Sequence, residues 1–314
     1  MTITDLKTGE NKVSYLSNGV KISALVYIPK DYKEDKKRPA IVITRPGSGV
    51  KEQTASIYAK KFCEQGFVTL AFDPKGFGES EGTSCWENPY SIIEDTKNAV
   101  SFICTLSQVA TEKVFNIGIC MGAGYAGFAT ALDSRIQGYA MITPDIGEYY
   151  DWREALGGAV NIRNNVLPIF SQARQNLFET GENTFFQMVP ESEKDMKRPG
   201  VMDSQIQARA YYLNQESGGM VPNWKNTLNM SGIENLLGMT VFQVIDLLEG
   251  VPFFMATGTE AHGYKHAVRY YNEVNAPKDQ LILDGVNHFD VYWKPEYVNP
   301  ITEKIAAFFN ITDV

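Results

Sequence analysis

The 314-residue sequence predicts an α/β protein with a mostly parallel, doubly wound sheet and an inserted helical cap. Short apolar runs rich in β-branched residues alternate along the chain with amphipathic stretches. Such alternation is typical of a parallel sheet covered by helices on both faces. A long span, residues 146–250, lacks this rhythm and interrupts it. We therefore expect a single domain over residues 1–314, with this span as its cap.

The expected strands and helices follow from the spacing of apolar residues. In chain order, the expected strands cover residues 21–28, 40–44, 67–72, 114–119, 139–143, 252–257 and 280–283. Apolar residues three and four apart predict helices over residues 54–65, 91–105, 123–132 and 302–310. These elements account for most of the chain outside the inserted span.

The inserted span is rich in Asn, Gln, Met and Tyr and shows helical patches. A structureless loop of this length is uncommon inside a compact domain, so we expect a helical cap or lid. Caps over α/β sheets commonly close a pocket, and elaboration of the surface is the alternative. The aromatic and methionine side chains that predict an apolar acyl pocket, or ordinary core, are Tyr211, Tyr212, Met220, Trp224, Met230 and Met239.

The composition makes several kinds of partner unexpected. The chain has 29 basic and 37 acidic residues, a formal net charge of −8, and no Lys/Arg run longer than residues 36–38. We therefore expect neither nucleic acid nor membrane as partners. Residues 1–21 lack the pattern of a signal peptide, and no segment approaches ~20 apolar residues, so we expect a cytoplasmic protein. Without a CxxC pair, the cysteines are expected to be free thiols: Cys63, Cys85, Cys104 and Cys120.

The most informative segment, residues 114–125, reads as a strand, a tight turn and a helix containing Gly118-x-Cys120-x-Gly122. A nucleophile on a sharp strand-to-helix turn needs small residues two positions to either side, because its strained backbone brings neighbouring main chain close. The helix N-terminus would lower the pKa of the Cys120 thiol and offer the N–H of Met121 to a developing oxyanion. The alternative for Cys120 is a buried structural cysteine.

The same segment has a second interpretation as a dinucleotide-binding site. Gly122-x-Gly124-x-x-Gly127 opens the helix, and Asp145 follows the next strand, which outlines the fingerprint of such sites. We consider this interpretation the weaker one, because at least three strands precede this one and the glycine-rich turn already begins at Gly118. No organic cofactor is therefore expected.

Further residues could complete a hydrolytic site. The loop after the second expected strand is glycine-rich, so the backbone N–H groups of Gly47 and Ser48 could supply a second oxyanion donor, with an ordinary turn as the alternative. His288 follows the last expected strand, which is the position of the general base. His262 and His266 are four apart, but two imidazoles without a third ligand make a weak metal site. We expect no metal and interpret them as surface or pocket-lining residues.

The acid partner of His288 has three candidate assignments. Glu260 is the acidic residue in the turn after strand 252–257, where a carboxylate would orient the histidine. Asp145, which follows the preceding strand, is the second. The third is a dyad without any acid, because a low-pKa cysteine depends less on an activated base than serine does.

Together these segments resemble the α/β-hydrolase superfamily, and more narrowly the dienelactone-hydrolase-like group that includes bacterial YcjY-type hydrolases and fungal polyketide-pathway hydrolases. The likeness spans nearly the whole chain and rests on residues 49–53, 66–73, 76–80, 87–90, 118–120, 261–262 and 288–292. It implies an α/β-hydrolase fold with Cys120 as nucleophile, His288 as general base and an oxyanion hole near Met121 and Gly47.

Three segments depart from the pattern of this group: Thr44-Arg45-Pro46 stands in place of Gly-His-Pro, Met121-Gly-Ala-Gly124 in place of a Gly-Ser-Gly run, and Ala261 in place of the acid. Arg45 introduces a cation that would either bind an anionic substrate or pair with a carboxylate. We expect an esterase or thioesterase that cleaves an ester, lactone or thioester of a small-molecule acyl substrate through an acyl-cysteine. An acyltransferase or cyclase using the same intermediate, and a non-catalytic binding protein on this scaffold, are the alternatives. A homodimer is compatible with the sequence.

Overall fold

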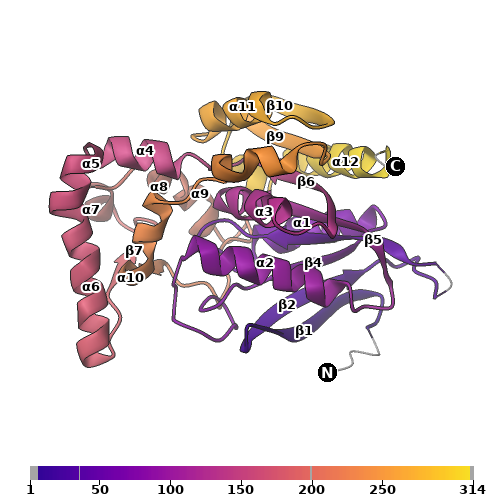
Figure 1. The fold of residues 1–314 in the computed structure, drawn as a ribbon, viewed down its shortest axis with the longest axis horizontal. Helices are drawn as coiled ribbons and strands as arrows, with labels where there is room; N and C mark the ends of the chain where they lie inside the picture. Colours follow the sequence, from indigo (N-terminus) through magenta and orange to yellow (C-terminus); the bar gives the residue numbers. More distant parts are fainter. Residues whose placement is uncertain (1–5, 35, 199, 312–314) are drawn as a thin grey trace.

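The computed structural model describes residues 6–34, 36–198 and 200–311 and is built around an eight-stranded sheet (Figure 1). The strand order is β1-β2-β4-β3-β5-β6-β9-β10. From β4 to β10 neighbouring strands run parallel, whereas β2 pairs antiparallel with both β1 and β4. The predicted, mostly parallel sheet is therefore confirmed. The strands are β1 (Gly9–Ser17), β2 (Val20–Ile28), β3 (Arg38–Thr44), β4 (Val68–Phe72), β5 (Val109–Ile119), β6 (Ile136–Ile142), β9 (Phe253–Glu260) and β10 (Lys278–Asn287).

Helices cover both faces of this sheet, so its central strands are buried from either side. On β3, Ile41 and Ile43 belong to one hydrophobic cluster with residues of α1 and α12. Ala40 and Val42 of the same strand belong to another cluster with residues of α2. Burial on both faces explains the continuous apolar runs in the sequence. The helices that flank the sheet are α1 (Thr54–Glu64), α2 (Pro89–Ile103), α3 (Met121–Ala131), α11 (Tyr264–Glu273) and α12 (Pro295–Ile311).

All seven predicted strands are present, and three elements outside the inserted span were not predicted from apolar spacing: β1, α11 and the short 3₁₀ helix η4 (Asp290–Tyr292). β1 is an edge strand that pairs with β2, and most of its side chains are partly or fully exposed. It therefore lacks the apolar run by which the other strands are recognised. The second is α11, in which only His266, Ala267 and Tyr270 are buried.

The segment between β6 and β9 is mostly helical and lies beside the sheet, at the left of Figure 1. It also carries an antiparallel pair of short strands, β7 (Phe185–Gln187) and β8 (Thr227–Asn229), which apolar spacing does not predict. Its helices are α4 (Glu148–Ala155), α5 (Gly158–Asn161), η1 (Ile162–Val166), α6 (Leu167–Thr180), α7 (Glu193–Met196), α8 (Asp203–Gln207), α9 (Arg209–Tyr212), α10 (Met230–Ile233), η2 (Glu234–Leu237) and η3 (Val241–Leu248).

Two features of the sequence can be compared with the structure directly. Within the described residues, none of the four cysteines forms a disulfide. The same residues contain no helix with the length and apolar character needed to span a lipid bilayer.

Candidate active site

Cys120 lies on a sharp turn between β5, which ends at Ile119, and α3, which begins at Met121. Its backbone has φ 57° and ψ −127°, a strained conformation for a residue with a side chain. A Cβ at Gly118 would overlap the backbone of Gly122, and a Cβ at Gly122 would overlap the carbonyl oxygens of Thr44 and Arg45. Both glycines are therefore required by close backbone contacts, as the Gly-x-Cys-x-Gly spacing predicts.

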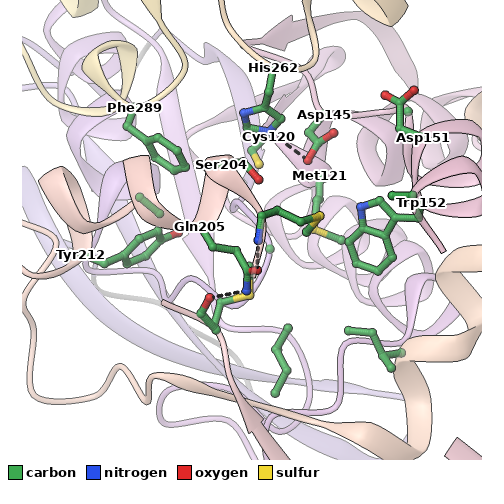
Figure 2. Close-up of a pocket in the computed structure, with 18 of the residues that line it drawn as sticks. Cys120, Met121, Asp145, Asp151, Trp152, Ser204, Gln205, Tyr212, His262 and Phe289 are labelled. Carbon is green, nitrogen blue, oxygen red and sulfur yellow. Dashed lines mark hydrogen bonds and ion pairs between the residues drawn. The ribbon is translucent and has the colours of Figure 1, made fainter. Parts of the chain in front are cut away.

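A cavity of about 250 Å³ opens beside this turn. Its wall includes Gly47, Cys120 and Met121 from the sheet side and apolar side chains from the inserted segment, among them Trp152 and Leu228. Figure 2 shows Cys120, His262 and Asp145 together in the upper part of the pocket. The cavity thus combines a thiol and an imidazole with a largely apolar wall.

The thiol of Cys120 is in hydrogen-bonding contact with the phenol of Tyr292, which also lines the cavity. The Tyr292 Oη lies 3.1 Å from Nε2 of His288, and Nδ1 of His288 lies 3.1 Å from Oγ1 of Thr143. Thiol, phenol and imidazole therefore form one chain of hydrogen bonds. His288 itself is fully buried and is not part of the cavity wall.

Burial is the main cause of the shifted pKa values of His288 and Tyr292. It lowers the pKa of His288 well below 6.5, and the neighbouring His262 lowers it further. Burial also raises the pKa of Tyr292 well above 10, and a charge on Cys120 adds to this effect. At neutral pH the His288 imidazole is therefore neutral, with one ring nitrogen able to accept a proton.

A second imidazole, that of His262, lies against the first. The ring centroids of His262 and His288 are 4.0 Å apart, and Nε2 of His262 lies 3.2 Å from Oδ2 of Asp145. Burial lowers the pKa of His262, but the charge and hydrogen bond of Asp145 outweigh burial and raise it overall. Both His262 and Asp145 line the cavity.

The structure corrects the assignment of Glu260 as the acid partner of His288. Glu260 ends β9 with an exposed side chain, and its backbone pairs with Asn287 of β10. Asp145, the second candidate, contacts His262 instead. Among the described residues, no carboxylate hydrogen-bonds to His288, whose Nδ1 is occupied by Thr143. The arrangement therefore favours the interpretation without an acid on His288.

Two further predicted site residues have structural partners rather than substrate-facing positions. The Arg45 side chain is fully buried, its Nη1 donates to Glu87 Oε1 at 2.9 Å, and its guanidinium packs on the Phe77 ring. The Ser48 N–H donates to Glu87 Oε2 at 3.0 Å. Arg45 is thus the partner of a carboxylate and not a substrate ligand, and the Ser48 N–H is not available to an oxyanion.

The other two predicted oxyanion donors are the backbone N–H groups of Gly47 and Met121. Gly47 and Met121 both line the cavity next to Cys120. Within the described part of the chain, no acceptor is present for either backbone N–H. The N–H of Met121 belongs to the first turn of α3, where backbone donors have no partner inside the helix.

Three contacts of the site are not evident from the sequence: those of Thr143 and Tyr292 with His288, and that of His262 with Asp145. Tyr292 is four residues after His288, and the segment 288–292 is part of the family resemblance, so a local signal was present. Thr143 and Asp145 follow β6, whereas His262 follows β9, and these strands are neighbours in the sheet. Contacts between ends of neighbouring strands depend on strand order, which apolar spacing does not reveal.

Comparisons with known proteins identify the family to which the chain belongs. The family model described as serine aminopeptidase, S33 (Hydrolase_4) matches residues 36–212, more than half of the chain. Protein YcjY of Escherichia coli K12 is 30% identical over 312 residues, which cover 96% of this chain and 99% of YcjY. Polyketide transferase claH of Penicillium crustosum is 26% identical, with 80% of this chain and 81% of that protein covered.

A solved structure shows the same architecture over almost the whole chain. The crystal structure of the hypothetical protein PA2218 from Pseudomonas aeruginosa superposes with a TM-score of 0.85 at 29% identity. The match covers 98% of this chain and 94% of PA2218. Together with the strand order and the turn at Cys120, these matches show that the chain belongs to the serine aminopeptidase S33 family of α/β hydrolases, within its YcjY-type group.

Proposed function

We propose that this hydrolase uses Cys120 as a nucleophile that attacks an ester, lactone or thioester carbonyl and forms an acyl-enzyme. The observation that carries the proposal is the position of Cys120, held on a strained strand-to-helix turn at the wall of a largely apolar cavity. A structural cysteine needs neither the strained backbone nor the cavity.

The hydrogen-bonded chain behind the thiol supplies the route for its proton. As the sulfur attacks, the Cys120 proton passes to the oxygen of Tyr292 while the Tyr292 hydroxyl proton passes to Nε2 of His288. This route requires the His288 tautomer that carries its hydrogen on Nδ1 and donates it to Thr143. General base catalysis of this kind contributes ~10²- to 10⁴-fold to a rate.

The backbone N–H groups of Met121 and Gly47 would stabilise the oxyanion that forms on the attacked carbonyl. The carbon–oxygen or carbon–sulfur bond of the substrate then breaks, and the acyl group stays on the sulfur. Water in the cavity releases the acid and restores the thiol. This sequence of steps needs no redox change and no reactant other than the acyl substrate and water.

Transfer of the acyl group to an alcohol or amine is the second candidate function. It is supported by the likeness to a polyketide transferase and by an apolar cavity wall that limits access of water to the intermediate. Hydrolysis and transfer share every step up to the acyl-enzyme, so the acceptor alone distinguishes them.

The test is a panel of acyl esters, lactones and thioesters assayed with the unmodified protein, Cys120→Ala and Cys104→Ala. We expect turnover and an acyl adduct in the unmodified protein, loss of both in Cys120→Ala, and retention of both in Cys104→Ala, whose cysteine is outside the cavity. Turnover by Cys120→Ala at the unmodified rate would contradict the proposal. Product partition between water and an added amine or alcohol then separates hydrolysis from transfer.

A further inference from the structure

The two histidines of the site differ in what they can reach. Both ring nitrogens of His288 have partners, Tyr292 and Thr143, and the residue is fully buried. A molecule in the cavity therefore meets Tyr292 but not the His288 imidazole. The group that gives a proton to the leaving group, or takes one from an attacking water, must therefore be another side chain that faces the cavity.

His262 has the position that such a group requires. It lines the cavity together with Cys120, and its side chain is 28% exposed. Asp145 holds Nε2 of the ring at 3.2 Å, and within the described residues no hydrogen bond occupies Nδ1. This is the arrangement of a histidine oriented by a carboxylate, with its second nitrogen directed to a reaction partner. Figure 2 shows this ring beside Cys120, with a dashed line to Asp145.

The contact between the rings limits their combined charge. Two imidazolium ions with ring centroids 4.0 Å apart repel each other. A state in which only one of the two rings is positively charged is therefore favoured over a state in which both are. Asp145 contacts His262 and not His288, so the carboxylate favours His262 as the ring that carries this single charge.

From these positions we infer that His262, held by Asp145, is a second catalytic acid and base of this site, which serves the leaving group and the acceptor while Tyr292 and His288 serve the thiol. The inference rests on the proposed function of Cys120. In acylation, protonated His262 gives its proton to the departing oxygen or sulfur as the thiol proton reaches His288. The charge thereby moves from His262 to His288.

Deacylation reverses both transfers. Neutral His262 takes a proton from the attacking water, alcohol or amine, and the bond between the acyl carbon and the sulfur breaks. The departing thiolate recovers its proton from His288 through the Tyr292 hydroxyl. One positive charge is present on the two rings before and after each half-reaction, and the protons balance over the cycle.

The test separates the two half-reactions by rapid mixing with a p-nitrophenyl ester, whose leaving group needs no acid. In His262→Gln, the initial release of p-nitrophenolate should stay within ~3-fold of the unmodified protein, whereas steady-state turnover should fall ~100-fold or more. Acyl-Cys120 should then accumulate in the mass spectrum. For the matching alkyl ester, acylation should slow as well, because an alkoxide leaving group does need a proton.

Three comparisons make the result specific. Asp145→Asn should reproduce the selective loss of deacylation, and azide, which attacks without losing a proton, should restore turnover to His262→Gln. His266→Gln is the matched control, because His266 is also paired with a carboxylate, Asp151, at 2.9 Å but is not part of the cavity wall. The initial release and the steady-state turnover of His266→Gln should both match those of the unmodified protein. Circular dichroism checks that each variant is folded.

The outcomes that overturn the inference differ from those that overturn the proposed function. If the initial release slows in His262→Gln as much as the turnover does, or if neither changes, His262 has no separate role and the inference is wrong. If the unmodified protein forms no adduct on Cys120 with any substrate, the proposed function fails, and the inference fails with it.

Discussion

At the scale of single residues, one hydroxyl group connects the thiol of Cys120 to the imidazole of His288. Removing it should interrupt the route of the thiol proton without creating a large cavity. Tyr292→Phe is therefore expected to slow acylation ~100-fold. Stopped-flow measurement of the initial product release checks this. Tyr212→Phe is the control, because Tyr212 also lines the cavity but has no hydrogen bond to His288, and a similar loss in both variants would contradict the relay.

The buried imidazole of His288 also affects stability in acid. Burial and the nearby His262 hold its pKa well below 6.5 in the folded protein. As pH falls below 6.5, the unfolded chain binds a proton at this residue before the folded chain does, so acid favours unfolding. His262, whose pKa is raised, acts in the opposite direction: the stability that it contributes is present below 6.5 and is lost at higher pH.

Replacing His288 should therefore weaken the acid sensitivity. In His288→Gln, the decrease of the unfolding free energy between about pH 6.5 and about pH 5 should be smaller by up to ~1.4 kcal/mol per pH unit. Urea titrations of both proteins at several pH values measure this difference. Parallel curves for the two proteins would show that His288 binds its proton equally in both states.

The location of the acid shows what sequence reasoning could and could not supply at this scale. Cys120 and the glycines around it were predictable because their spacing is local to one turn. Glu260 was chosen because it follows the expected strand, but sequence position does not fix which way a side chain at a strand end points. The actual carboxylate contact, from Asp145 to His262, joins residues 117 positions apart.

At the scale of elements, the fit of α3 against the loop after β3 holds the turn at Cys120. Gly122→Ala should destabilise the fold by at least ~2 kcal/mol, because the new Cβ overlaps the backbone of residues 44 and 45. Gly124→Ala, in the same helix, would bring its Cβ 3.4 Å from Ile146 Cγ2 and 3.9 Å from Met239 Cε, both ordinary van der Waals contacts, and should be neutral or stabilising. Urea denaturation of both variants measures the effect, and equal stability would contradict this account of the turn.

Most of the predictable strands are buried on both faces, and their apolar runs reveal them. All seven predicted strands are present, including β10, an edge strand whose side chains are mostly partly or fully exposed. β1 and β7 have mostly partly or fully exposed side chains, and β7 and β8 are only three residues long, so these strands owe their formation to pairing with a neighbouring strand. Apolar spacing carries no information about that pairing.

At the scale of the whole molecule, one wall of the cavity comes from the sheet side and contains Cys120, and the other is a largely apolar wall from the inserted segment. Ser204 of α8 lies on that second wall. Ser204→Leu should reduce kcat/KM for the longest accepted acyl chain ~10-fold and leave that for acetyl esters nearly unchanged, because the larger side chain fills part of the cavity that a long chain needs and a short one does not. A series of p-nitrophenyl esters of increasing length, with Ser204→Ala as control, checks this. A uniform decrease over all chain lengths would contradict it.

The inserted segment has a consequence for how such proteins diverge. Residues 146–250 contain Trp152, Ser204 and Leu228 of the cavity wall, whereas Cys120, Tyr292, His288 and the His262–Asp145 pair all lie outside this span. Mutations in that stretch can therefore alter which molecules are accepted while the bond-breaking groups stay in place. Gene duplicates could acquire new substrates by drift in one contiguous block of codons, without passing through an inactive ancestor.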